Sequence, residues 1–284
     1  MAEFVFEDKD LTGVKGQVVV LTGGSSGIGL ATVDLLLSLG ASVVNGDVQP
    51  APKEISGPYT YVKTDVSSWS EVLELFKKAK ETYGRIDHVF ANAGLGPRAN
   101  YISTEVDENG DLKPPTSALL DVSLNGVINT STIGIFYLRQ QPEGGSITIT
   151  GSTCGLQRLR AVDYSVAKHA VLGFGRGLYP LLHAANIPIR VNTLAPSWAE
   201  SNVLPNLKEL MQAIDVELQP ASAVARGAVL VMSDASRDGQ VIQIQRGRYK
   251  EIDETILLPA YDTARGDYPS EEEVLRRAAA LEAA

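Results

Sequence analysis

The chain has 284 residues, of which 44% are hydrophobic and 21% are charged, a balance typical of a globular protein with a sizeable core. Its formal net charge of −9 argues against a nucleic-acid partner, because phosphate backbones are bound by clustered Lys and Arg. The one cysteine, Cys154, excludes an intrachain disulfide, and this fits a reducing compartment.

Short apolar runs alternate with helical stretches along the chain. Several runs are β-branched and apolar on both faces, as expected for strands of a parallel sheet covered on both sides. The predicted strands are residues 17–21, 42–47, 59–62, 88–91, 146–150, 189–194 and 240–245. The predicted helices are residues 28–39, 69–83, 119–138, 162–185 and 222–233, and Ser68 with Glu71 forms a capping box before the second helix.

This alternation predicts an α/β fold with one open, doubly wound parallel sheet. We see no internal repeat and no linker between two cores, so we expect a single domain over residues 1–284 with a C-terminal extension at about residues 248–284. The segments 94–115 and 193–220 are irregular, the second with a short helix near residues 208–217. Both follow strands, and ligands bind beyond the carboxyl ends of strands in such sheets. We therefore expect these loops to form the substrate walls.

The acidic first residues, 1–10, lack the apolar core of a secretory signal. No apolar run approaches the roughly 18 residues needed to span a bilayer. We therefore expect a cytoplasmic protein with no membrane partner.

A glycine-rich turn, TGGSSGIG at residues 22–29, follows the first strand and opens the first helix. Glycines there let the backbone approach a pyrophosphate, whose charge is favoured by the free amides of the helix N-terminus. Glycine-rich turns also occur in ordinary loops, but the position between a strand and a helix favours dinucleotide binding. The residues expected to contact the cofactor here are Gly23, Ser25, Ser26, Gly27, Ile28 and Gly29.

Asp47 ends the second strand, 18 residues after Gly29. The dinucleotide fingerprint places an acidic residue about 20 residues on, where it accepts hydrogen bonds from ribose hydroxyls. A carboxylate there repels a 2′-phosphate and so selects NAD over NADP, and the nearest basic residue, Lys53, lies six residues on. The alternative is a solvated carboxylate at a strand end.

Tyr164 and Lys168 occur in the segment YSVAK within a predicted helix, so they share one helix face. A phenol with a pKa of about 10 is a poor proton donor or acceptor near neutrality. A neighbouring ammonium lowers that pKa and suits the phenol to general acid–base catalysis. Taken alone, the pair is better explained as a surface Tyr–Lys contact.

Together these motifs resemble the short-chain dehydrogenase/reductase family. The features that match in order are the turn TGGSSGIG, Asp65-Val66, Asn92-Ala93-Gly94, Ser152, YSVAK, Val191-Asn192 and Pro196. The resemblance runs from about Gly16 to Gly247 and implies a single-domain Rossmann fold in three layers, α/β/α.

The resemblance also implies site roles. Ser152 would hold the substrate oxygen, Tyr164 would transfer the proton, and Lys168 would bind the nicotinamide ribose and tune Tyr164. The further cofactor contacts that it implies are Asp65 and Val66 at the adenine, Asn92, Ala93, Gly94 and Pro196 beside the cofactor, and Ser201 near the nicotinamide carboxamide.

One departure from the family pattern concerns a proton relay. Family members carry Asn in the helix after the fourth strand, where it holds a relay water, and this chain has Ser123 there. Asn125 is two residues later and faces another side of the helix, so it does not substitute. Two smaller departures are Ser197 in place of a glycine after Pro196 and a Ser152-to-Tyr164 spacing one residue short.

We interpret the chain as an NAD-dependent oxidoreductase that transfers a hydride between nicotinamide and a secondary alcohol or ketone. Leu95, Pro97, Tyr101, Leu156, Leu159 and Trp198 in the loops indicate a fairly apolar substrate, such as a lipid, steroid-like or secondary-metabolite alcohol. The alternatives are an NADPH-dependent ketoreductase, which Asp47 opposes, and a dinucleotide-binding protein with a non-redox or regulatory role. The histidines lack metal-ligand spacing, so we expect no metal site.

The resemblance further implies a homodimer or homotetramer that assembles through the helices 119–138 and 162–185. Apolar residues on them that could form such a contact are Ile128, Ile133, Phe136, Val171, Leu172 and Leu178, although some must face the sheet. The C-terminal extension would cover either a neighbour or the active site.

Overall fold

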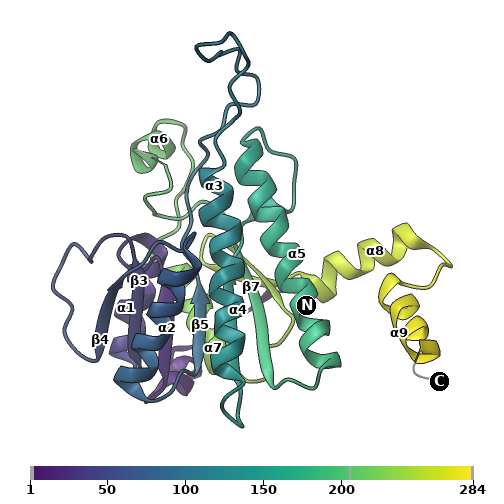
Figure 1. The fold of residues 1–284 in the computed structure, drawn as a ribbon. Helices are drawn as coiled ribbons and strands as arrows, with labels where there is room; N and C mark the ends of the chain where they lie inside the picture. The colour runs from purple at the N-terminus through teal and green to yellow at the C-terminus, as the bar shows by residue number, and fades with distance from the viewer. Residues whose placement is uncertain (1–2, 205, 283–284) are drawn as a thin grey trace.

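A computed structural model describes residues 3–204 and 206–282. Its centre is a nine-stranded sheet in the order β1-β9-β8-β7-β6-β5-β2-β3-β4 (Figure 1). Strands β2 to β8 run parallel, as predicted, whereas β9 pairs antiparallel with β8, and β1 pairs antiparallel with β9. The strands are β1 (Glu3–Phe4), β2 (Val18–Thr22), β3 (Ser42–Asp47), β4 (Tyr59–Lys63), β5 (His88–Ala91), β6 (Gly145–Thr150), β7 (Ile189–Pro196), β8 (Val241–Gln245) and β9 (Arg248–Glu251).

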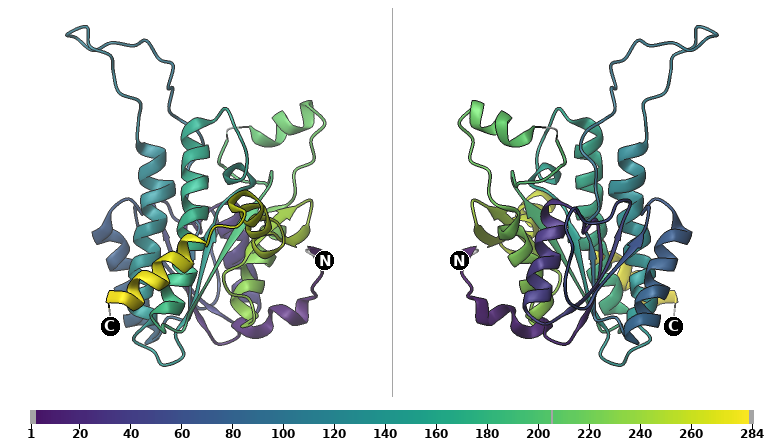
Figure 2. Two further views of the ribbon diagram at one scale, coloured as in Figure 1. Left: turned by 90° about the vertical axis from the view of Figure 1, so that its right-hand side faces the viewer. Right: turned by 90° about the vertical axis from the view of Figure 1, so that its left-hand side faces the viewer.

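Helices cover both faces of the sheet and make three α/β/α layers (Figures 1 and 2). One layer contains η1 (Asp8–Val14), α1 (Gly27–Ser38) and α7 (Ala221–Ser233), and the other contains α2 (Trp69–Tyr83), α4 (Gly126–Leu138) and α5 (Val162–Ala184). The remaining helical segments are α3 (Ala118–Leu120), η2 (Asp121–Asn125), η3 (Thr153–Gly155), α6 (Leu207–Ala213), η4 (Asp253–Leu257), α8 (Leu258–Arg265) and α9 (Glu271–Glu282). The predicted doubly wound fold is confirmed.

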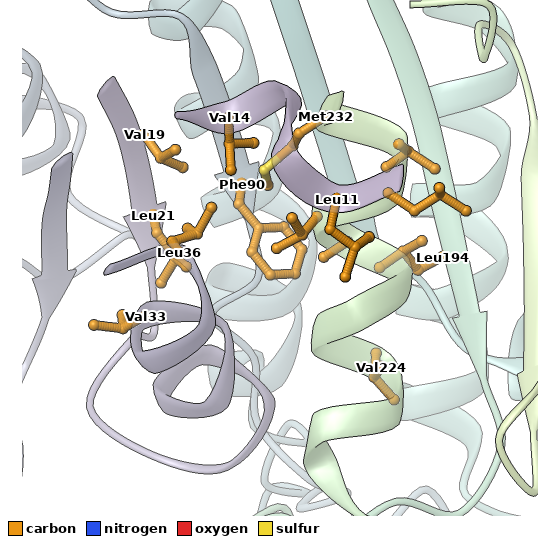
Figure 3. Packing of buried hydrophobic residues seen from close by; sticks show 14 of the residues in the cluster. Leu11, Val14, Val19, Leu21, Val33, Leu36, Phe90, Leu194, Val224 and Met232 are labelled. Carbon is orange, nitrogen blue, oxygen red and sulfur yellow. The ribbon is translucent and has the colours of Figure 1, made fainter. Parts of the chain in front are cut away.

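Two buried clusters hold the layers together, one on each face of the sheet. Alternate side chains of β2 point to opposite faces, so Val19 and Leu21 join one cluster and Val20 joins the other. Figure 3 shows the first cluster, in which the ring of Phe90 on β5 lies among side chains from β2, α1 and η1. The strands of the sheet are therefore fixed by packing on both faces.

The antiparallel edge is a difference from the sequence prediction, which began a C-terminal extension at about residue 248. Residues 248–251 instead form β9, because Arg246 and Gly247, with φ of 52° and 68°, make a two-residue hairpin turn after β8. Two consecutive residues with positive φ produce the turn type whose twist matches antiparallel strands. The part of the tail that leaves the sheet, α8 and α9, lies beside the domain (Figure 1). It is away from the carboxyl edge of the parallel strands, from which the long loop after β5 projects. It does not cover that edge.

The predicted helix at 119–138 is one continuous helical run, Ala118–Leu138, with a π-helical segment at η2. This 21-residue run is long and apolar enough to cross a membrane by length and composition, contrary to the sequence expectation. It packs against α2, β5 and β6 in this structure, so it is a core helix of the α/β/α fold. Of the six apolar residues proposed for subunit contact, Ile133, Val171, Leu172 and Leu178 are buried in the chain's own core, and Phe136 is 61% exposed.

Only one of the two hydrogen bonds of the predicted capping box before α2 forms. The Ser68 hydroxyl accepts the Glu71 amide at 3.4 Å, but the Glu71 carboxylate accepts the amide of Asp65 at 2.8 Å, rather than that of Ser68. The helix start is thus tied back to the end of β4.

Candidate active site

The strand order places a reversal between β2 and β5, because the chain winds outward through β3 and β4 and then returns to β5. Ligands in open α/β sheets bind beyond the carboxyl ends of strands at such a point. The long loop after β5 and the segment carrying α6 after β7 both project from this edge (Figure 1). The predicted site residues lie on the turns and helices that leave it.

The turn between β2 and α1 leaves no room for a side chain at several of its glycine positions. Gly23 and Gly27 have φ of 72° and 48°, which favour glycine. A Cβ on Gly29 would lie 2.0 Å from the Gly23 carbonyl oxygen, and one on Gly23 would lie 2.8 Å from the Ala93 Cα. The Ser26 side chain at the N-cap of α1 makes no capping hydrogen bond. The first amides of α1 therefore keep their capacity to bind an anion, and the turn fits a pyrophosphate.

Strand β3 holds the turn in shape. Asn45, fully buried, accepts the Gly24 amide at 2.8 Å. The Asp47 carboxylate accepts the amides of Ser25 at 3.0 Å and Gln49 at 3.2 Å. Asp47 thus lies beside the glycine turn, where the sequence placed the ribose-binding carboxylate. The basic residue nearest in sequence, Lys53, is paired with Asp34 at 2.7 Å.

Asn92 connects the glycine turn to β6. Its side-chain amide donates to the carbonyls of Thr22 at 3.1 Å and Gly23 at 3.2 Å, and it accepts the Thr150 hydroxyl at 3.1 Å. The Thr22 hydroxyl in turn accepts the amides of Asn92 and Ala93. Asn92 and Ala93 therefore lie at the centre of the site, and the Asn92 side chain is engaged in joining three strands.

Lys168 and Tyr164 lie on one face of α5, as their spacing predicts. The Lys168 ammonium lies 5.6 Å from the centroid of the Tyr164 ring and donates to the Thr150 carbonyl at 2.8 Å. Ser152 follows β6, its hydroxyl lies 3.4 Å from the Pro196 carbonyl oxygen, and it is close enough to Tyr164 to lower the pKa of that phenol. The structure thus brings Ser152, Tyr164, Lys168 and Pro196 together.

The expected lowering of the Tyr164 pKa by Lys168 is not found. Burial raises the pKa of Tyr164 to about 12, and the hydrogen bond from Ser152 offsets only part of this. Burial also lowers the pKa of the Lys168 ammonium to about 8. Desolvation disfavours the charged form of each group, so it moves the two pKa values in opposite directions.

Ser123, on η2, is fully buried and faces this site. Its hydroxyl accepts the amide of Leu95 at 2.9 Å, and it lies beside Gly94, where an added Cβ would be 3.4 Å from the Ser123 hydroxyl and 3.9 Å from the Lys168 nitrogen. Asn125 is exposed and bonds Asp121, so it faces elsewhere, as the sequence indicated. The serine therefore fastens the loop after β5.

The other residues that were expected to contact the cofactor lie in two groups, one of Asp65 and Val66 and one of Ser201. Asp65 lies at the end of β4, and its carboxylate accepts the amide and hydroxyl of Ser67, while buried Val66 packs on Gly126 of α4. Ser201 lies against the glycine turn, since a Cβ on Gly27 would be 3.2 Å from its Cα. Both groups flank the same edge of the sheet.

Two of the apolar loop residues that were taken to indicate an apolar substrate face elsewhere. Leu156 packs in a small core cluster with Leu172 and Ile252. Leu159 lines a groove on the outer face of α5 with Val162 and Val166. The indication of an apolar substrate therefore depends on Leu95, Pro97, Tyr101 and Trp198. The sequence reasoning gave no role to Asp163, which is 1% exposed and precedes Tyr164; an acid in the first turn of a helix was the available signal.

Comparisons with known proteins identify the family of the chain. A family model described as short chain dehydrogenase matches residues 17–211. A short-chain dehydrogenase/reductase, ascJ, of Acremonium egyptiacum is 53% identical over 264 residues, which cover 92% of this chain and 88% of the relative. A 5′-hydroxyaverantin dehydrogenase of Dothistroma septosporum is 30% identical over 76% of this chain and 78% of the relative. Tropinone reductase-like 1 of Erythroxylum coca is 31% identical over 78% of this chain and 85% of the relative.

Solved structures show the same fold. A 3-ketoacyl-(acyl-carrier-protein) reductase from Brucella melitensis, complexed with NADH, aligns with a TM-score of 0.70 at 22% identity, over 82% of this chain and 98% of that one. A short-chain type dehydrogenase/reductase from Mycobacterium marinum aligns with a TM-score of 0.72 at 21% identity, over 84% and 98%. With the family model covering most of the chain and a relative 53% identical along nearly its whole length, the chain belongs to the short-chain dehydrogenase/reductase family.

Proposed function

We propose that the chain is an NAD-dependent oxidoreductase that interconverts a secondary alcohol and a ketone on a fairly apolar small molecule. The observation that carries the proposal is the convergence of Ser152, Tyr164 and Lys168 at the carboxyl edge of the sheet, next to the glycine turn. The names of relatives support a small-molecule alcohol or ketone, because they include a 5′-hydroxyaverantin dehydrogenase and a tropinone reductase-like protein. The fungal origin of the 53% identical relative, from Acremonium egyptiacum, supports a place in secondary metabolism.

In this proposal the bound dinucleotide supplies the hydride acceptor or donor. The amides at the start of α1 bind its pyrophosphate, and Asp47 binds a ribose. Ser152 donates a hydrogen bond to the substrate oxygen. Tyr164, protonated at neutral pH because its pKa is about 12, gives its proton to that oxygen when a ketone is reduced. Lys168 positions the ribose while it is anchored on the Thr150 carbonyl.

Preference for NAD is the finer part of the proposal, and it depends on Asp47. The carboxylate lies at the glycine turn, and Lys53, the basic residue nearest to it in sequence, is paired with Asp34. A 2′-phosphate would therefore meet a negative charge. We expect NAD to bind at least about tenfold more tightly than NADP, measured as dissociation constants by fluorescence titration. Equal affinity, or tighter NADP, contradicts the preference and favours the NADPH-dependent alternative.

The activity is tested by following reduced nicotinamide absorbance with a panel of secondary alcohols and ketones. Tyr164→Phe removes the hydroxyl and keeps the ring, so kcat should fall by about 100- to 10,000-fold while the dissociation constant for NAD stays within about twofold. Tyr179→Phe, toward the other end of the same helix, is the matched control and should keep full activity. A Tyr164→Phe protein with normal turnover on its best substrate would support the non-redox alternative.

A further inference from the structure

A buried carboxylate stands directly before Tyr164 and takes no part in the proposed chemistry. Asp163 is 1% exposed. A buried carboxylate needs hydrogen bonds or an opposite charge to remain in the folded protein. The hydrogen bonds found for it among the described residues come from backbone amides: those of Arg98 at 2.8 Å and Ala99 at 2.9 Å reach one oxygen, and that of Tyr164 at 2.9 Å reaches the other.

These amides keep the carboxylate charged. Burial raises the pKa of Asp163, but the hydrogen bonds from Ala99, Arg98 and Tyr164 outweigh burial and hold the pKa below its usual 3.8. Hydrogen bonds to a charged group are roughly twice as strong as those between neutral groups. The carboxylate is therefore a strong acceptor throughout the neutral range.

The arrangement does more than cap a helix. An acid in the first turn of α5 needs only the amides of that turn, yet two of the three amides come from the loop after β5, 64 and 65 residues earlier in the chain. The same loop is bound at Leu95 by Ser123 on η2. The base of the loop, residues 95–99, is thus fastened to both helices that carry site residues, while the rest of the loop extends outward (Figure 1).

We propose that Asp163 is a positioning residue that fastens the base of the substrate wall, residues 95–99, to the turn of α5 that carries Tyr164. It acts through backbone amides on both sides and so sets the distance between the wall and the Tyr164 hydroxyl. Its kinetic consequence rests on the oxidoreductase function proposed above, whereas its structural consequence does not. Because small misplacements of a substrate cost large factors in rate, loss of this link lowers turnover without removing any reacting group.

The first test is amide hydrogen exchange, which needs no substrate. In the wild-type protein the amides of Arg98 and Ala99 should be protected to a degree similar to Leu95, although they lie at the root of an exposed loop. Asp163→Asn replaces one acceptor oxygen by an NH₂ group that faces an amide donor. Exchange at Arg98 or Ala99 should then be at least about tenfold faster, while Leu95 remains held by Ser123. Unprotected Arg98 and Ala99 in the wild-type protein overturn the proposal, whether or not the variant folds.

The second test is kinetic. Asp163→Asn should raise KM for the alcohol, lower kcat, and reduce kcat/KM at least about tenfold, with the NAD dissociation constant unchanged because the glycine turn is not touched. Asp121→Asn is the matched control, since that carboxylate bonds only the side chains of Ser117 and Asn125 among the described residues, and it should change neither readout. Faster exchange with unaltered kcat/KM overturns the positioning role. Absence of turnover in the wild-type protein contradicts the oxidoreductase function instead, and the exchange result still stands.

Discussion

Replacing Lys168 by Met should stabilise the cofactor-free protein at neutral pH while abolishing turnover. The Lys168 side chain is 4% exposed, and burial lowers the pKa of its ammonium from 10.5 to about 8. The unfolded chain therefore binds this proton more tightly than the folded chain. The stability linked to Lys168 is fully present above the unfolded value of 10.5 and is lost as the pH falls through about 8.

The size of the effect follows from the two pKa values. At pH 7 the difference between 10.5 and about 8 destabilises the folded wild-type protein by roughly 3 kcal/mol, and at pH 10 by roughly 1 kcal/mol. Met has a similar unbranched chain and no proton, so its own contribution does not vary with pH. The loss of the hydrogen bond to the Thr150 carbonyl lowers the stability of the variant at both pH values. The advantage of the variant over the wild type should therefore shrink by about 2 kcal/mol between pH 7 and pH 10.

Urea unfolding of both proteins at pH 7 and pH 10, at one protein concentration, measures this change in the difference between their unfolding free energies. Lys208→Met, an exposed lysine on α6, is the matched control for the loss of one positive charge. A difference between wild type and Lys168→Met that is constant over this pH range would refute the reasoning. It would mean that the ammonium is solvated and that burial is not what tunes the catalytic pair.

Two further predictions concern the turn and the assembly. Gly29→Ala should lower the unfolding free energy by about 1–3 kcal/mol and weaken NAD binding, because its Cβ would lie 2.0 Å from the Gly23 carbonyl oxygen. Gly173→Ala is the control: it has open space around it and should be neutral or stabilising by up to about 1 kcal/mol. Equal melting temperatures for the two variants would contradict this prediction. We also propose that the chain forms a homodimer or homotetramer through α4 and α5. Phe136→Asp, at a residue of α4 that is 61% exposed, should then give a smaller species by light scattering. Ile102→Asp, at a residue of the loop after β5 that is 90% exposed, should leave the size of the assembly unchanged. A wild-type monomer at micromolar concentration would exclude this assembly.

The sequence was informative where local pattern determines structure. Strand and helix alternation predicted seven parallel strands within a few residues, and the YSVAK spacing placed Tyr164 and Lys168 on one helix face. The hairpin to β9 was missed, because Arg246-Gly247 lacks the Asn-Gly or Asp-Gly pair that signals such a turn. The Asp163 bonds to the loop after β5 join segments 64 and 65 residues apart, and no local pattern encodes that distance.

The pKa of Tyr164 was predicted in the wrong direction for a related reason. Spacing alone showed an ammonium near a phenol and so a lowered phenol pKa. Burial depends on the packing of β6, α5 and the loops around the pair, and it acts on both groups at once. It is the largest influence on Tyr164 and raises the pKa of that phenol to about 12.

The consequence is an inverted order of proton release. In water a phenol and an ammonium lose their protons at similar pH, about 10 and 10.4. In this site Lys168 loses its proton at about 8 and Tyr164 at about 12, so the ammonium is by far the stronger acid. Environments that move the pKa values of two neighbouring titratable groups apart in this way are typical of acid–base sites. Because Tyr164 is protonated at neutral pH, the cofactor-free site already holds the proton that reduction of a ketone consumes. Running in the reverse direction, as an alcohol dehydrogenase, requires that proton to leave first, so oxidation must either be favoured by alkaline pH or depend on a charge that enters the site with the ligands.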